Sequence, residues 1–192
     1  MTTERDARGT IEEVRGRLDP RLQRTWAVAQ LTSLFSSGSV PDPAPDGFLP
    51  GELVATTTTR GLDAFNRRIA SLWMPWRGKS FDASSQTGIN ILEPSARTPM
   101  KVVWPSYEPA LTTEDRIEAF RFRTRIEGSA AEPSLPVLKI DYDSDDNPSL
   151  IIRRILDELV QVDDDLCLGR ALYRTRNRWH TLLFFTLERR TT

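Results

Sequence analysis

Residues 120–126 read Phe-Arg-Phe-Arg-Thr-Arg-Ile, and this stretch decides the fold class. One face would carry Phe120, Phe122, Thr124 and Ile126, and the other the arginines at 121, 123 and 125. A strict period of two is typical of a β-strand with one buried face and one solvated face. The stretch therefore predicts a strand whose phenylalanines point into a core and whose arginines point to solvent.

Shorter segments with similar alternation lie on both sides of this strand, with turn residues between them. We expect strands at Ile89–Ile91, Met100–Trp104 and Leu138–Tyr142, and a hairpin of residues 166–174 and 178–189. Short strands at regular intervals favour a sandwich or barrel over an α/β fold. The pattern predicts a mainly β protein built on an antiparallel β-barrel.

Residues 147–162 fit two structures. Asn147-Pro148 is a good helix start, and the apolar residues from Ile151 to Val160 have helical spacing. The acidic turn at Asp163–Asp165, between two apolar runs, instead indicates a hairpin in which 155–162 is a strand. We favour the hairpin.

The N-terminal part predicts helices. Thr10 to Glu13 has a capping-box pattern, and Asp19-Pro20 begins a second helix with a broad apolar face. This helix either packs on the core or covers a cavity as a lid. We expect a helical cap at 1–38, a Pro-rich linker at 39–50 and a barrel domain at 51–192, with a short helix at Gly61–Trp73.

Composition narrows the class of partner and compartment. The formal net charge is -1, so no overall field attracts nucleic acid or an anionic membrane. No apolar run approaches the roughly 20 residues that span a bilayer, and residues 1–17 do not resemble a signal peptide. The single cysteine, Cys167, cannot form an internal disulfide. We expect a cytoplasmic protein.

Motifs for phosphate, metal or nucleophilic chemistry are missing. The sequence has no Walker A loop, no G-x-G-x-x-G and no G-x-S-x-G. The acidic run from Asp141 starts like a calcium loop, but Asp146 stands where glycine is needed and Ile152 where glutamate is needed. We therefore expect no metal and no cofactor.

His180 is the only histidine, so any Ser-His or Cys-His site would depend on it. Cys167 could lie across the predicted hairpin from it, although chance placement explains this proximity better. Axial ligation of haem is another use of a lone histidine on a barrel strand, but no other feature supports haem.

The most unusual segment is Trp73–Phe81, which reads Trp-Met-Pro-Trp-Arg-Gly-Lys-Ser-Phe. Aromatic rings with cationic ends suit an amphipathic ligand, with Arg77 or Lys79 holding a carboxylate or enolate. Alternatively, Trp73 and Trp76 plug the end of the barrel and Arg77 stacks on them. Both hypotheses stay open.

Residues 76–81, Trp-Arg-Gly-Lys-Ser-Phe, resemble the W-x-G-K-x-F segment of bacterial lipocalin-like proteins. The pattern from Asp157-Glu158-Leu159 to Leu168-Gly169-Arg170 is similar to their C-terminal hairpin, and the resemblance covers 47–190. Those proteins also carry a GxWxG-type motif, whereas Leu49–Leu53 has no Trp. The resemblance implies a calycin-type, lipocalin-like barrel with an interior pocket, and no particular reaction.

The leading hypothesis is a barrel that binds a small hydrophobic or amphipathic molecule. Its interior would be lined by aromatic residues and its mouth by the unusual segment: Trp104, Phe120, Phe122, Tyr142 and Trp179 inside, and Trp73, Trp76, Arg77 and Lys79 at the mouth. An alternative is a cyclase or isomerase of secondary metabolism that uses the same pocket, with proton donors or acceptors among Tyr142, Asp157, Glu158 and His180. A third is an interaction module with a filled barrel.

Overall fold

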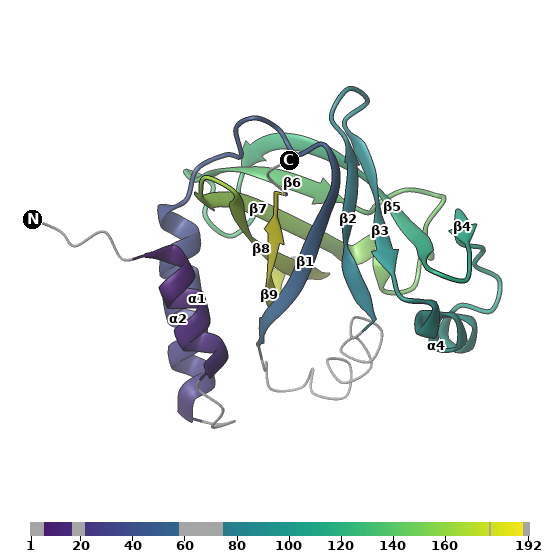
Figure 1. The fold of residues 1–192 in the computed structure, drawn as a ribbon, viewed down its shortest axis with the longest axis horizontal. Coiled ribbons are helices and arrows are strands. Elements are labelled where there is room, and N and C mark those ends of the chain that lie inside the picture. Colours follow the sequence, from purple (N-terminus) through teal and green to yellow (C-terminus); the bar gives the residue numbers. More distant parts are fainter. Residues whose placement is uncertain (1–5, 17–21, 58–74, 177, 190–192) are drawn as a thin grey trace, which may run out of the picture.

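A computed structural model describes residues 6–16, 22–57, 75–176 and 178–189 (Figure 1). The helices are α1 (Ala7–Gly16), α2 (Leu22–Ser37) and α4 (Arg97–Val103), with 3-10 turns η1 (Pro94–Ala96) and η2 (Ile152–Arg154). The strands are β1 (Gly47–Thr56), β2 (Trp76–Asp82), β3 (Thr87–Leu92), β4 (Leu111–Thr112), β5 (Ile117–Gly128), β6 (Pro136–Asp141), β7 (Ile155–Asp163), β8 (Leu166–Thr175) and β9 (Arg178–Glu188). Across these ranges, no helix has both the length and the apolar character needed to cross a bilayer.

Eight of the strands close into a barrel. The sheet order is β3-β2-β1-β9-β8-β7-β6-β5-β4, and an additional pairing of β3 with β5 joins its two sides. Every pairing is antiparallel, and the short β4 lies outside the ring on β5. The predicted class, a mainly β, lipocalin-like antiparallel barrel with N-terminal helices, is confirmed.

The buried apolar residues form two cores, one inside the barrel and one on the outer face of its wall. The inner core contains Phe122 and Phe185. The outer core lies between the helices and the wall, where Leu31 and Phe35 of α2 pack with Val160 and Phe184. Figure 1 shows α1 and α2 standing beside the wall of the barrel. The second helix therefore packs on the core, and the lid interpretation is wrong.

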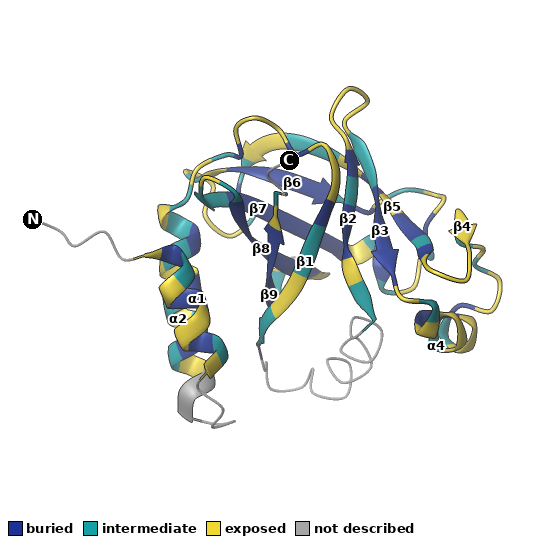
Figure 2. Ribbon diagram, viewed as in Figure 1, coloured by how far each residue is buried: buried dark blue, intermediate teal, exposed yellow. Residues whose placement is uncertain are grey.

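Burial on both faces explains why β7 resembles a helix in sequence. Ile155 and Leu159 point into the barrel, whereas Val160 points toward the helices. Figure 2 shows β6, β7 and β8 buried along most of their length. A strand covered on both sides needs no polar alternation. The hairpin interpretation of 155–162, and the hairpin of β8 and β9, are confirmed.

The strand predicted at Met100–Trp104 is wrong. Residues 97–103 form helix α4, in which Met100 is buried and Val102 is 76% exposed. Pro94 opens the 3-10 turn η1, and η1 runs directly into α4 with Pro99 in its first turn. Proline is well tolerated at such a start. Five residues are too few for alternation to separate strand from helix.

Two further expectations concern boundaries. Strand β1 begins at Gly47, so the last residues of the 39–50 segment lie in the barrel wall. The helix predicted at Gly61–Trp73 lies outside the described residues.

Candidate functional site

A lysine and an aspartate form an ion pair across the inside of the barrel. Lys79 on β2 and Asp157 on β7 are fully buried, and Lys79 Nζ lies 2.9 Å from Asp157 Oδ2. Three strands separate β2 from β7 on either route around the ring. The pair therefore joins opposite walls of the barrel.

Tyr142 and Asn90 complete this group, which we call the Lys79 cluster. Lys79 Nζ donates to Asn90 Oδ1 at 2.9 Å and to the Tyr142 hydroxyl. The Tyr142 hydroxyl donates to Asp157 Oδ2 at 2.9 Å. Asn90 Nδ2 donates to the same hydroxyl at 3.2 Å and to the carbonyl oxygen of Phe120 at 3.1 Å. Groups from β2, β3, β5 and β7 thus meet in one polar network, with Tyr142 directly after the end of β6.

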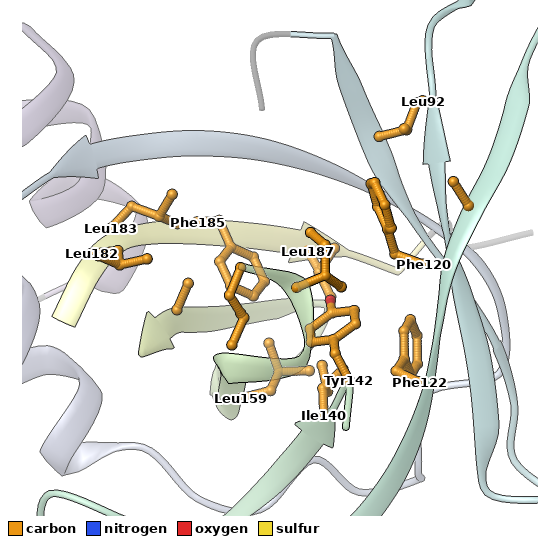
Figure 3. Packing of buried hydrophobic residues seen from close by; sticks show 14 of the residues in the cluster. Leu92, Phe120, Phe122, Ile140, Tyr142, Leu159, Leu182, Leu183, Phe185 and Leu187 are labelled. Carbon is orange, nitrogen blue, oxygen red and sulfur yellow. The ribbon is translucent and has the colours of Figure 1, made fainter. Parts of the chain in front are cut away.

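Four aromatic rings surround the ammonium of Lys79. Its Nζ lies 5.2 to 5.5 Å from the ring centres of Trp76, Phe122, Tyr142 and Phe185. Figure 3 shows Phe122, Tyr142 and Phe185 projecting into the interior from different parts of the wall. Ring faces attract cations, most strongly where water is excluded, whereas Tyr142 contacts the ammonium through its hydroxyl. Trp76 is half-buried and the other three rings are buried.

Glycines on neighbouring strands make room for three of these rings. A Cβ atom would lie 2.3 Å from the Trp76 ring at Gly51, 2.4 Å from the Phe122 ring at Gly88, and 2.2 Å from the Phe185 ring at Gly169. Any larger residue would push a ring out of its place. The cage is therefore built by these glycines as much as by the aromatic residues.

A bulge at Gly78 puts Trp76 and Lys79 on the same side of β2. Residues three apart in a regular strand face opposite ways, but the register of β2 against β3 shifts between Trp76 and Gly78. Gly78 has φ 145°, and a Cβ there would lie 2.2 Å from the Leu49 carbonyl oxygen. Glycine is required at this point.

Burial changes the proton affinities in the cluster. Desolvation lowers the pKa of Lys79, and the nearby Asp157 carboxylate partly offsets this effect. Desolvation raises the pKa of Tyr142 well above its usual value, and the charge of Asp157 raises it further. Tyr142 is therefore a neutral hydroxyl over the physiological range.

One oxygen of the cluster has no partner. Among the described residues, the buried side-chain atoms without a hydrogen bond are Asp157 Oδ1 and Asn147 Oδ1. The Asn147 atom is a neutral amide oxygen, whereas Asp157 Oδ1 belongs to a carboxylate. A buried, unbonded charged oxygen is costly.

The structure separates the four candidate proton-transfer residues. Tyr142 and Asp157 meet inside the barrel. Glu158 points the other way and pairs with Arg170 at 2.8 Å on the outer wall. His180 lies near the β8–β9 turn, with Nε2 2.8 Å from Thr175 Oγ1. It is five residues, or roughly 16 Å of strand, from Phe185.

The predicted ligand-binding residues are also divided. Lys79 is fully buried and does not lie at a mouth. Arg77 is exposed, where it pairs with Glu93 at 3.2 Å. The Trp179 ring lies 5.8 Å from the guanidinium of the exposed Arg174, so it does not join the cage. Trp73 lies outside the described residues.

Trp104 and Phe120 form a second aromatic group near α4. Their ring centres are 5.3 Å apart, and the Tyr107 ring stacks on Phe120 at 5.3 Å. Phe120 has φ 56°, and its amide donates to the Tyr107 hydroxyl at 2.7 Å. The register of β5 against β3 shifts at Phe120, which is therefore a bulge residue. The bulge turns the Phe120 carbonyl oxygen toward Asn90. The second group therefore adjoins the Lys79 cluster.

Cys167 and His180 do not form a site. Cys167 pairs with Leu187 in the β8–β9 hairpin, whereas His180 pairs with Tyr173. Burial raises the pKa of the Cys167 thiol to about 11, which leaves it a poor nucleophile. Within the described ranges, no three His, Cys, Asp or Glu side chains are grouped to hold a metal ion.

Sequence reasoning did not identify Asn90, Phe185 or the three glycines as part of a site. Asn90 carried a usable signal, because it is a polar residue between Ile89 and Ile91 in a short apolar strand. The glycines carried none, since their role depends on rings from other strands.

Three surface pockets of the described residues are separate from the cluster. One of about 260 Å³ is lined by Phe48 and Arg189, among others, one of about 220 Å³ by Phe81, among others, and one of about 170 Å³ lies beside α4 at Met100 and Tyr107. None is lined by a member of the Lys79 cluster. The chemistry of the buried cluster makes it the stronger candidate.

The chain is similar to a solved structure of a protein from Thermomonospora curvata. The TM-score is 0.53 at 16% sequence identity, and the likeness covers 100% of both chains. At this identity the likeness shows the fold alone. No protein-family model matches the sequence, and no curated protein does.

Proposed function

We propose that the barrel binds a small amphipathic molecule, with the polar head of the ligand at the Lys79 cluster. The observation that carries this proposal is the buried Asp157 carboxylate, whose Oδ1 has no partner among the described residues. A core filled only for stability would favour apolar side chains, since replacing a buried ion pair by such residues is often neutral or stabilising. A bound ligand that donates a hydrogen bond to Oδ1 would remove the cost of burying this oxygen without a partner.

The aromatic cage supports an apolar body for the ligand. Binding sites for small molecules are lined mainly by apolar and aromatic groups with a few placed polar atoms. The interior has this character around Trp76, Phe122 and Phe185. The resemblance of residues 76–81 to lipocalin-like proteins agrees with the same use, and eight-stranded barrels can hold one small ligand.

Native mass spectrometry of the protein purified from its own host is the direct test. We expect a bound small molecule that is lost on denaturation. Recovery of the bare chain alone would favour a filled barrel that acts as an interaction module. The single thiol of Cys167 fits the proposed cytoplasmic location, so the preparation should be kept reducing.

A fluorescent probe tests the position of the site. N-phenyl-naphthylamine, an uncharged amphipathic dye, should brighten on binding. Trp76→Ala should weaken this binding, because Trp76 is the half-buried ring of the cage. Trp179→Ala is the matched control, since that ring lies by Arg174 outside the cage. Equal loss in both variants, or none in either, would contradict the placement.

A second candidate function is proton transfer, as in an isomerase or cyclase. It is favoured by the same oxygen, because Asp157 Oδ1 is open to a substrate proton, and the Tyr142 hydroxyl lies beside it at Oδ2. Enolisable cyclic ketones incubated with the protein in D₂O should then gain deuterium. Exchange no faster than with Asp157→Asn would exclude this role for those substrates.

A further inference from the structure

All three N–H bonds of the Lys79 ammonium are already used. They point to three acceptors: Asp157 Oδ2, Asn90 Oδ1 and the Tyr142 hydroxyl. Three acceptors match the three donors of a protonated lysine. Lys79 has no donor left for a ligand.

The other donors of the cluster are used as well. The Tyr142 hydroxyl donates to Asp157 Oδ2, and the two N–H bonds of Asn90 Nδ2 go to Tyr142 and Phe120. Trp76 Nε1 donates to Asn90 Oδ1 at 3.2 Å. Every donor of the cluster is therefore used, and Asp157 Oδ1 has no donor among the described residues.

We infer that the barrel selects an uncharged ligand bearing a hydrogen-bond donor, an alcohol hydroxyl, that bonds to Asp157 Oδ1. This inference rests on the proposed function and names the ligand class. It departs from the sequence-based hypothesis that Lys79 holds a carboxylate or enolate, because Lys79 already holds a carboxylate of its own chain.

Charge excludes the other common head groups. A ligand carboxylate at Asp157 Oδ1 would bring two negative groups together without water, and one of them would have to take up a proton. A ligand ammonium would meet Asp157, but at a carboxylate that Lys79 already neutralises and beside its Nζ. A hydroxyl supplies the missing donor and adds no charge.

Ligands that share one skeleton and differ in the head group test this selectivity. Naphthylmethanol, methylnaphthalene, naphthoate and naphthylmethylamine would be compared by calorimetry on the full chain, together with the matching octyl series. The alcohol should bind roughly 10- to 100-fold tighter than the hydrocarbon, as expected for a hydrogen bond to a charged group. It should also bind more tightly than the acid and the amine.

Two neighbouring variants provide the mutational test. Asp157→Asn replaces the open acceptor by an amide and should remove the preference for the alcohol. Glu158→Gln is the matched control, because Glu158 is the next residue on β7, equally buried, and ion-paired on the outer wall. It should keep the preference. Circular dichroism would establish that both variants fold.

The outcomes separate this inference from the proposed function. Binding of acid or amine as tight as the alcohol would overturn the inference and leave the proposed function standing. Binding of no member of either series would overturn both. A crystal structure of the unliganded protein gives an independent result: water donating to Asp157 Oδ1 supports the inference, and a donor from the chain itself overturns it.

Discussion

Two buried ion pairs lie back to back on β7, and they differ in how completely their carboxylates are bonded. Glu158 on the outer wall accepts from Arg170 Nε and Nη2 and from Ser129 Oγ through one oxygen, and from the Ala130 amide through the other. Asp157 on the inner face has one oxygen with two donors and one with none from the part of the chain that the structure describes. Two adjacent acidic residues thus have a complete and an incomplete set of partners.

This difference in hydrogen bonding indicates that the two ion pairs have different roles. The outer pair ties the loop at Ser129 to β8, and the Arg170 guanidinium lies 4.2 Å from the centre of the Phe35 ring of α2. It therefore anchors the helical cap to the wall. The inner pair joins opposite walls but leaves an acceptor open, which structural joining alone does not require. Satisfaction of hydrogen bonds, and not burial, distinguishes the two.

The largest expected effect is on the inner pair. Lys79→Met leaves the buried Asp157 carboxylate without its counter-ion, and should lower the free energy of unfolding by about 3–5 kcal/mol. The double variant with Asp157→Leu should recover most of this loss, because no unpaired charge remains and only the Tyr142 hydroxyl loses its acceptor. Urea denaturation measures both. A double variant as unstable as the single one would show that the inner pair is structural.

The outer pair should behave differently. Arg170→Met should destabilise by a similar amount, but adding Glu158→Leu should leave a loss of about 2 kcal/mol, since the Ala130 amide and the Ser129 hydroxyl then lack their partner. Urea denaturation of the single and double variants measures both losses of unfolding free energy. Full recovery in this double variant would erase the contrast between the pairs.

A smaller effect is expected at a cage glycine. Gly169→Ala brings a Cβ against Phe185 and should cost about 1–3 kcal/mol through overpacking, with weaker dye binding as the ring shifts. Gly16→Ala is the control, because a Cβ there meets nothing within 4 Å. If thermal denaturation and dye titration give the same result for both variants, the cage does not depend on its glycines.

The smallest effect concerns alkaline pH. The pKa of Tyr142 is raised in the folded protein, so its contribution to stability is complete below about pH 10, where an unfolded tyrosine titrates, and falls as the pH rises further. Tyr142→Phe removes this contribution. The difference in unfolding free energy between wild type and variant should therefore shrink above that pH. A difference that stays constant would place Tyr142 outside a desolvated site.

Local patterns in the sequence predict those parts of the structure that have one buried face. The alternation at Phe120–Ile126 correctly assigned Phe122 to the inside and Arg121 to the outside, but Ile126, predicted on the face of Phe122, is 63% exposed. At Met100–Trp104 the same reasoning failed, because five residues alternate by chance and Pro94 and Pro99 favoured a helical start. In β7 burial on both faces removed the alternation, and the acidic turn after it was the better guide.

The sequence by itself determined the β-rich class, the wall strands with one solvated face and the choice of Trp76, Lys79, Tyr142 and Asp157 as residues of interest. Only the tertiary structure decided that these four meet, because β2, which carries Trp76 and Lys79, lies across a closed ring from β7, which carries Asp157, and Tyr142 follows β6. It also decided that Asp157 faces inward and Glu158 outward, since the register of β7 sets its two faces. The bulge at Gly78 places Lys79 on the inner face of β2 together with Trp76, and the local sequence does not predict this orientation.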